Sequence, residues 1–178
     1  MGVLTTERLI LEPITLPIVE ACFAGDRAAL EDCCRAKVPE AWPGRALVER
    51  AFCASLERIR LDPATRLWGD RLKIAREGER VVVGSVIFHG RPGDDGVAEI
   101  GYGVEESWQN KGVASEATRA CVQWALAQDG VRVVRATTPP WHTASVRVLE
   151  KSGLTRIGTE CHEALGEVLV FETRVTAP

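Results

Sequence analysis

The chain has 178 residues, of which 46% are hydrophobic and 26% are charged, and its formal net charge is -3 at pH 7. These values fit a single globular domain over residues 1–178. The small negative charge argues against general binding to nucleic acid or to an anionic membrane. No apolar run approaches the ~20 residues that a membrane-spanning helix needs, and the N-terminus lacks a signal-peptide pattern.

The chain contains six cysteines, whose spacing forms neither a C-x-x-C pair nor a zinc-ligand pattern with the three histidines. Most of them have apolar neighbours in the sequence, which is typical of small core residues in a reducing compartment. The sequence therefore predicts a cytoplasmic protein without a metal site.

The first part of the chain combines one strand with several helices. The run Arg8–Pro13 (RLILEP) alternates in polarity and ends in proline, so it predicts a strand. A helical pattern follows over residues 17–37, and Asp26 is the expected N-cap of its second half. Another helix is predicted from residue 46 to about residue 60, before Pro63 stops the pattern.

Strands dominate the second part of the chain. Two strand-like runs joined around Gly78 predict a hairpin, and residues 97–104 (VAEIGYGV) predict another strand. A helix over about 112–128 and a strand at VRVVRATT follow. The next helix, TASVRVLEKSG, has Thr143 as its expected N-cap and Gly153 as its C′ residue.

Two final strand-like runs, 154–158 and 167–175, complete an order of elements that predicts the architecture. The strand–helix–strand units centred on residues 112–128 and 143–152 need crossover connections, which make part of the sheet parallel. The strands before these units form an antiparallel meander. The fold class is therefore α/β of the α+β type, with a mixed sheet and helices on both faces.

The segment ESWQNKGVASEA, residues 106–117, lies between a predicted strand and a predicted helix. A helix N-terminus leaves backbone N–H groups unpaired and binds phosphate readily. Gly112 and Ala114 would let a phosphate approach the backbone, and Lys111 could add charge. The alternative is a plain strand-to-helix turn. The Walker loop and the dinucleotide fingerprint are both absent, which argues against a nucleotide-binding protein.

This loop and its flanks carry a resemblance to a known family. The loop resembles Q/R-x-x-G-x-G/A, the acetyl-CoA pyrophosphate motif of the GNAT superfamily of N-acetyltransferases, through Gln109, Asn110, Lys111, Gly112, Val113 and Ala114. AEIGYGV resembles the fourth strand of that superfamily, and HTASVRVLEKSGL resembles its N-x-x-S segment. TTERLILEP is similar to the first strand of the branch that includes the ribosomal-protein N-terminal acetyltransferases.

The strong resemblance covers roughly residues 80–158. It implies a GNAT-like, mostly antiparallel, twisted sheet of about seven strands. It also implies that the fourth and fifth strands, here about 97–104 and 131–138, splay apart around the pantetheine arm of acetyl-CoA. Backbone groups near Val104 would pair with that arm, and the amides of residues 109–114 would hold the pyrophosphate.

The same resemblance implies an acetyl-CoA-dependent N-acetyltransferase that needs no metal. Its acceptor would be a primary amine on a protein N-terminus, an amino acid or another small molecule, and the amine would attack directly in a ternary complex. A homodimer is also compatible with the family.

Glu99 is the candidate general base, acting directly or through water. A carboxylate inside an apolar strand is expected to have a raised pKa, which suits this role. The alternative is a glutamate paired with an arginine at the edge of the sheet. Tyr102, the only tyrosine, could be an acid, but in a regular strand it points to the face opposite Glu99, which favours core packing.

Ser145 matches the family serine near the thiol end of the cofactor, so it could position the thiol or relay a proton. Helix capping is the alternative. His142 stands where the family usually has asparagine, and its imidazole could bind pantetheine or act in catalysis. Many relatives carry their general acid as a tyrosine after residue 145, and this chain has none. A second hypothesis therefore stays open, a non-catalytic acyl-CoA-binding or sensing module.

The acceptor side of this fold is shaped by the N-terminal helices and the last strand pair. Acidic residues and one tryptophan in these regions would suit a cationic amine, and an ordinary solvated surface is the alternative. These residues are Glu31, Asp32, Glu40, Trp42, Glu160 and Glu163.

Overall fold

The computed structural model describes residues 2–40, 42 and 56–175. The described helices and strands follow the chain in this order: β1 (Leu4–Thr5), β2 (Leu9–Pro13), α1 (Leu16–Ala24), α2 (Arg27–Cys34), α4 (Leu56–Leu61), α5 (Pro63–Arg66), β3 (Arg71–Ala75), β4 (Val82–Phe88), β5 (Val97–Val104), the 3-10 helix η1 (Glu106–Trp108), α6 (Val113–Leu126), β6 (Val133–Thr138), α7 (Thr143–Lys151), β7 (Thr155–His162) and β8 (Gly166–Arg174). Most of the helix predicted over 46–60 lies outside the described residues, and its described end is α4.

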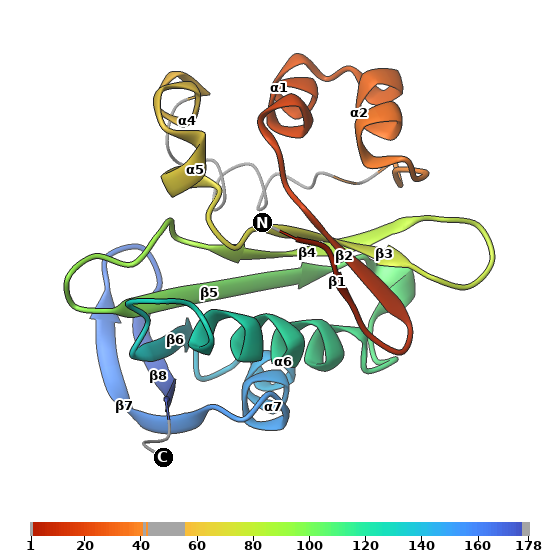
Figure 1. Cartoon of the computed structure of the whole chain (residues 1–178). Coiled ribbons are helices and arrows are strands. Elements are labelled where there is room, and N and C mark those ends of the chain that lie inside the picture. Colours follow the sequence, from red (N-terminus) through yellow and green to blue (C-terminus); the bar gives the residue numbers. More distant parts are fainter. Residues whose placement is uncertain (1, 41, 43–55, 176–178) are drawn as a thin grey trace.

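One eight-stranded sheet runs through the molecule in the order β1-β2-β3-β4-β5-β6-β8-β7. β5 and β6 are parallel, and the other pairs between described strands are antiparallel. Helices α1, α2, α4 and α5 lie on one face, and α6 and α7 lie on the other (Figure 1). The expected mixed, mostly antiparallel sheet with helices on both faces is confirmed. The two-residue β1 is the strand that the sequence did not predict.

The two strand–helix–strand units are built differently. Helix α6 connects β5 to β6, and these strands are parallel neighbours, as predicted. Helix α7 connects β6 to β7, but β8 lies between these two strands and pairs antiparallel with each. The second crossover therefore adds no parallel pair, because the β7–β8 hairpin returns β8 to the edge of β6.

Two hydrophobic clusters fill the space on either side of the sheet. On one face, Ala98 and Ile100 of β5 pack in a cluster with α6 residues such as Ala117. On the other face, Leu72 and Ile74 of β3 share a cluster with residues of α1 and α2. All seven residues of β4 are buried, so this central strand is held in the core, and β5 pairs with it.

The helix ends predicted from local sequence signals are confirmed in part. Asp26 caps α2 as predicted, and its carboxylate accepts a hydrogen bond from the Ala29 amide at 3.0 Å. Pro63 follows the end of α4 but also opens α5, because its missing N–H is no loss in a first turn. The prediction of Thr143 as an N-cap is wrong, since α7 is capped by His142.

The cysteines divide between core and surface. Cys34 and Cys121 are buried and Cys22 is half-buried, whereas Cys33 and Cys161 are exposed. Cys53 lies outside the described residues. Among the described helices, none has the length and apolar character needed to cross a membrane.

Candidate active site

Strands β5 and β6 separate part-way along their length. They pair from Val97 and Val133 to Glu99 and Arg135, and no further. Beyond this point, β5 stays paired with β4 as far as Val104, while β6 stays paired with β8. The backbone edges that face each other beyond Glu99 therefore border an opening, which is the splay that the resemblance implied.

The loop at the end of this opening exposes backbone donors. Asn110 and Gly112 have φ values of 59° and 77°, and Gly112 is the N-cap of α6. Within the described part of the chain, the N–H groups of residues 112–115 have no hydrogen-bond acceptor. These amides lie at the positive end of the α6 dipole, so they could hold an anionic group such as a pyrophosphate.

The side chains of the loop point away from these amides. The Gln109 side-chain amide folds back and donates to the Val104 carbonyl at 3.3 Å, which fixes the end of β5. The Lys111 ammonium lies 5.4 Å from the centre of the Trp108 ring. Val113, the first residue of α6, is buried in the core, while Asn110 and Gly112 are exposed. The loop is therefore anchored by side chains and presents its backbone outwards.

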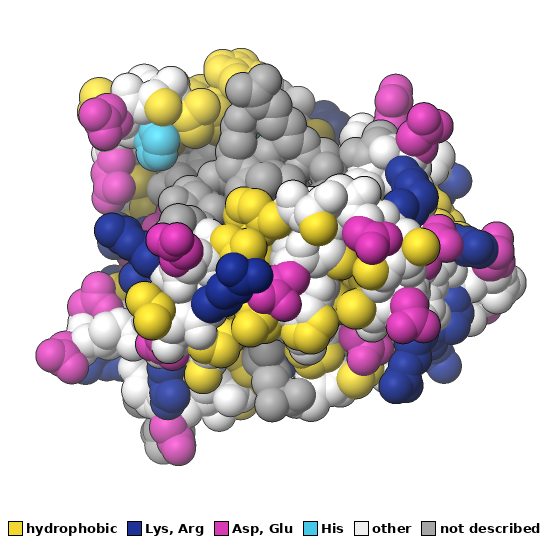
Figure 2. Space-filling view, turned by 90° about the horizontal axis from the view of Figure 1, so that it is seen from above, with side chains coloured by type: hydrophobic (Ala, Val, Ile, Leu, Met, Phe, Trp, Pro, Cys, Tyr) yellow, Lys and Arg dark blue, Asp and Glu magenta, His cyan; other side chains and the backbone are white. Residues whose placement is uncertain are grey.

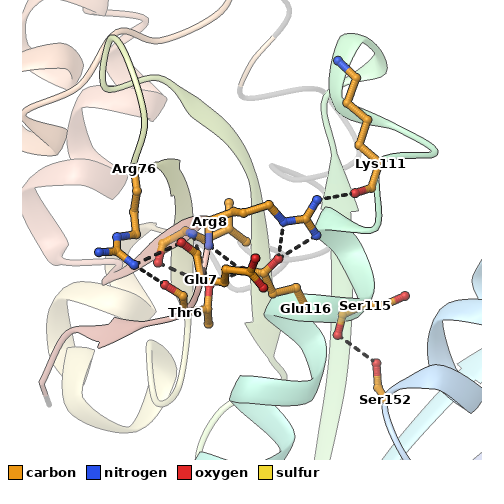
Figure 3. A network of polar contacts seen from close by, with 9 residues as sticks. Thr6, Glu7, Arg8, Arg76, Lys111, Ser115, Glu116 and Ser152 are labelled. Atoms are coloured by element: carbon orange, nitrogen blue, oxygen red, sulfur yellow. Dashed lines mark hydrogen bonds and ion pairs between the residues drawn. The ribbon is translucent and has the colours of Figure 1, made fainter.

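A polar network joins the first turn of α6 to the N-terminal turn of the chain (Figure 3). The Glu116 carboxylate accepts hydrogen bonds from the Thr6 hydroxyl at 2.6 Å and from the Arg8 backbone amide at 2.9 Å. The Arg8 guanidinium contacts the same carboxylate at 2.7 Å and donates to the Lys111 carbonyl at 2.6 Å. Burial opposes the effect of these bonds, yet together they hold the pKa of Glu116 below its usual value.

Tyr102 and Ser145 meet on the α6 and α7 side of the opening. The Tyr102 hydroxyl lies 2.9 Å from Ser145 Oγ and donates to the Ser145 carbonyl at 3.0 Å. Burial raises the pKa of Tyr102 to about 12, although the bond to Ser145 acts in the other direction. The phenol is therefore protonated at neutral pH. Its ring packs against the core as predicted, but the hydroxyl contact with Ser145 was not predicted.

His142 caps the helix that carries Ser145. Its Nδ1 accepts a hydrogen bond from the Ser145 amide at 3.2 Å, so in the neutral imidazole Nε2 carries the proton. The ring stacks on Trp141 with 5.7 Å between centroids, and Trp141 is exposed. His142 thus fixes the backbone at Ser145 and keeps one N–H donor free to act outside the helix.

Glu99 points to the opposite face of the sheet. Its Oε2 lies 3.4 Å from Nδ1 of His89, and its side chain is 40% exposed. The hydrogen bond from His89 lowers the pKa of Glu99; burial opposes this, while electrostatic interactions with His89, Arg135 and His162 add to the lowering. The expectation of a raised pKa is therefore wrong, because the partners of this carboxylate outweigh its burial.

Two of the residues expected to attract an amine, Trp42 and Glu31, are engaged elsewhere. Trp42 is buried in the cluster under α1 and α2, so it offers no exposed ring to a cation. Glu31 accepts a hydrogen bond from the Val38 amide and pairs with Lys37. In the space-filling view of this face, acidic and basic side chains are mixed and neither sign gathers in one patch (Figure 2). Among the described residues, no cluster of His, Cys, Asp or Glu side chains could hold a metal ion.

The separated strands and the loop before α6 lie within a region that matches a known family. The family model for the acetyltransferase (GNAT) domain matches residues 8–155. The chain belongs to the GNAT acetyltransferase family. As a member of this GNAT family, it is an acetyl-CoA-dependent acyltransferase.

Individual relatives agree with this assignment. The uncharacterized N-acetyltransferase YjdG of Bacillus subtilis (strain 168) is 29% identical over 153 residues, which span 86% of this chain and 89% of the relative. A GNAT-family acetyltransferase from Bacillus anthracis has a similar crystal structure, with a TM-score of 0.64, 22% identity, and 97% and 98% of the two chains covered. The ribosomal alpha-N-protein acetyltransferase RimL, solved in complex with coenzyme A, has a TM-score of 0.62 and 16% identity, with 98% of each chain covered. At these sequence identities, the two structures show that this GNAT domain shares their fold.

Three contacts around the GNAT site were not predicted. Arg8 and Glu116 lie in segments that the sequence assigned to a strand and a helix, and only the fold brings them together. His89 has the sequence context of an ordinary surface histidine, but it contacts Glu99. The position of Tyr102, three residues after Glu99 in a strand, was the available signal that it faces the α7 side.

Proposed function

We propose that this GNAT enzyme transfers the acetyl group of acetyl-CoA to a primary amine by direct attack in a ternary complex. The observation that carries the proposal is the opening between β5 and β6. Glu99 lies on one face at its vertex, and the pair Tyr102 and Ser145 lies on the other. An acetyl group in this opening would have a carboxylate on the side of attack and hydroxyl groups on the side of the leaving thiol.

The donor is proposed to bind along the splay and the loop. Unpaired backbone groups of β5 up to Val104 would pair with the pantetheine arm, and the free amides of residues 112–115 would hold the pyrophosphate. Gln109, Asn110 and Lys111 would shape this loop, and Val113 and Ala114 would continue it into α6. The His142 Nε2–H would donate to the pantetheine or thiol end.

Glu99 is proposed to receive a proton from the acceptor, directly or through a water molecule. An amine with a pKa near ~10 is mostly protonated at neutral pH and must lose a proton before its nitrogen can attack the thioester carbon. The lowered pKa of Glu99 keeps it in the carboxylate form, which also attracts the ammonium ion. A backbone N–H at the edge of the opening would stabilise the oxyanion.

Ser145 is proposed to protonate the departing thiolate as the carbon–sulfur bond breaks. Its hydroxyl contacts the Tyr102 phenol, which is protonated at neutral pH and can replace the proton that Ser145 gives up. The second proton that the attacking nitrogen loses as the amide forms then returns to Tyr102 through solvent. A thiolate with a pKa near ~8.5 leaves more easily when it is protonated in this step. The absence of a tyrosine after residue 145 is therefore compatible with catalysis.

The acceptor class is proposed from chemistry alone. A carboxylate at the vertex suits a cationic amine on a peptide N-terminus, an amino acid or a small molecule. RimL is described as acting on a ribosomal protein, which illustrates the peptide case in the same fold.

Two measurements test this function. The first is thermal unfolding with acetyl-CoA: at ~100 times Kd the ligand should add about 2.7 kcal/mol to the free energy of unfolding. The second is thiol release from acetyl-CoA across a panel of peptides, amino acids and polyamines, with each amine omitted in turn as the control. Absence of any shift at millimolar acetyl-CoA would rule out the proposed site.

The second candidate is a non-catalytic acyl-CoA-binding or sensing module. It is favoured by the lack of a C-terminal tyrosine and by histidine at position 142, both departures from the family pattern. A clear thermal shift with no thiol release for any amine in the panel would support it over the enzyme.

A further inference from the structure

Arg8 reaches from the N-terminal turn to the loop that precedes α6. Its Nη1 donates to the Lys111 carbonyl at 2.6 Å, and its Nε and Nη2 both lie 2.7 Å from Glu116 Oε2. Figure 3 shows the guanidinium between the loop and the first turn of the helix. The guanidinium is therefore held at three nitrogen atoms in a single orientation.

This orientation leaves two donors unused. A guanidinium has five N–H groups, one on Nε and two on each terminal nitrogen. Among the described residues, one N–H of Nη1 and one of Nη2 have no acceptor, and the side chain is 44% exposed. Nη2 lies 3.2 Å from the position that a Cβ on Gly112 would take. The free donors therefore lie beside the free amides of the helix N-terminus.

The negative charge of Glu116 gives the position of the Arg8 guanidinium an electrostatic effect on anion binding. A carboxylate in the first turn of a helix suits the helix dipole, but here it would repel an anion bound to the same turn. Hydrogen bonds from Thr6 and Arg8 keep Glu116 ionised at neutral pH, as its lowered pKa indicates. The adjacent guanidinium offsets this negative charge and adds directed donors on the side of the loop.

We propose that Arg8 is a phosphate-binding residue of the coenzyme A site, positioned by Glu116, so that the N-terminal turn forms part of that site. The proposal rests on the proposed binding of coenzyme A at residues 109–114. The two remaining N–H groups would donate to phosphate oxygens, as an arginine fork does with such groups. The backbone amides of residues 112–115 would hold the same group from the helix side.

The test is the affinity for coenzyme A, measured by calorimetry, of wild type, Arg8→Gln and a matched control. Arg76→Gln is the control, because Arg76 donates to the Thr6 and Glu7 carbonyls and so holds the same turn from its other side. Loss of charge-assisted hydrogen bonds is expected to weaken binding about tenfold or more in Arg8→Gln. Arg76→Gln removes an equal charge away from the loop and should change the affinity less than about twofold.

The salt dependence of the affinity distinguishes direct phosphate binding by Arg8 from a purely structural role of Arg8 in the loop. Raising the salt from about 0.05 M to about 0.5 M should weaken wild type clearly more than Arg8→Gln, because one screened charge contact is missing in the variant. Equal salt dependence in both proteins would overturn the proposal. So would an affinity of Arg8→Gln within about twofold of wild type, or equal losses in Arg8→Gln and Arg76→Gln.

Two controls keep these outcomes distinct. Wild type that fails to bind coenzyme A would overturn the proposed function itself, whereas the outcomes above would leave that function intact. If Arg8→Gln does not fold, Arg8→Lys replaces it, since lysine keeps the charge but lacks the planar fork. An affinity of Arg8→Lys within about twofold of wild type would then overturn the directed contact.

Discussion

The two ends of the opening between β5 and β6 present different chemical groups. At the loop end, the proposed donors are the backbone amides of residues 112–115 together with the Arg8 guanidinium. At the vertex, the proposed reactive groups are side chains, namely Glu99 on one face and Tyr102 with Ser145 on the other. Backbone amides can bind a phosphate whichever side chains their residues carry, whereas proton transfer needs particular side chains.

This difference predicts how each end responds to substitution. Apart from Arg8, the loop end should tolerate changes of side chain that leave the backbone conformation intact, and it should be sensitive to anything that fills the space in front of the amides. The vertex responds to loss of single functional groups and should do so without loss of donor binding. The predictions below test this division, from the largest expected effect to the smallest.

Gly112→Glu is expected to have the largest effect. Gly112 has a φ of 77°, and a side chain there would meet the Arg8 guanidinium and place a carboxylate before the free amides. Affinity for coenzyme A should fall at least ~100-fold, about 2.7 kcal/mol or more. Gly78→Glu is the matched control, because Gly78 has a φ of 73° and nothing lies within 4 Å of the position that its Cβ would take. Calorimetry that finds equal affinity in the two variants would contradict the placement of the site.

Glu99→Gln should lower kcat by about 100-fold with little change in the affinity for coenzyme A. Glu160→Gln is the control, since Glu160 lies 3.5 Å from the same Arg135 and is more exposed. The lowered pKa of Glu99 keeps its carboxylate ionised at neutral pH, so the basic form is lost only as the pH falls through that lowered pKa. Between about pH 6 and 8, the wild-type profile should therefore show no limb from Glu99. A kcat equal to wild type would remove Glu99 from the mechanism.

Tyr102→Phe should lower kcat by about tenfold, since it removes the hydroxyl that contacts Ser145 while keeping the packed ring. Ser145→Ala should act through the same step. The double variant should therefore lose less than the product of the two single losses. Steady-state kinetics on the four proteins measure this coupling. Independent, multiplicative losses would show that the two hydroxyls do not act together.

Lys73→Met should change stability more than activity. Lys73 is fully buried and donates to the Gly103 carbonyl at 3.0 Å, and burial lowers its pKa to about 7. The unfolded chain binds more protons at this residue between about pH 7 and its ordinary value of 10.5, so the wild-type free energy of unfolding should rise with pH across that window.

Lys73→Met removes this dependence and should stabilise the fold by about 1–3 kcal/mol at pH 7. Urea unfolding at pH 7 and pH 9 should show the advantage of the variant shrinking as the pH rises. Lys37→Met is the control, because the Lys37 side chain is 61% exposed. An advantage that grows with pH would contradict the sign of this effect.

The fold was largely predictable because its signals are local. Alternating strands, the apolar face of α6 and the Asp26 cap each depend on a few neighbouring residues. The place of β8 between β6 and β7 was not predictable, since strand order depends on contacts across the sheet. The cap of α7 was misplaced by one residue because histidine is an unusual cap and threonine a common one.

The candidate site stays a prediction, and its sequence signal is clear where a motif encodes it. The loop at residues 109–114 and the serine at position 145 lie in recognisable segments, and the structure gives them the expected neighbours, a helix N-terminus and the opening. The pKa of Glu99 was misjudged because its partner His89 comes from another strand end. Arg8 and Glu116 are 108 residues apart, and neither is unusual in its local sequence.

The separation of β5 and β6 has a consequence for the entropy of donor binding. One lip of the opening is fixed to β4 as far as Val104, and the other is fixed to β8 as far as Thr138. Each lip is thus part of a continuous ladder on its outer side, and no ligand is needed to hold the two apart. Chain folding has already ordered the backbone groups that would meet the donor, so binding need not order them again. The gap in the sheet is therefore preorganised for the donor.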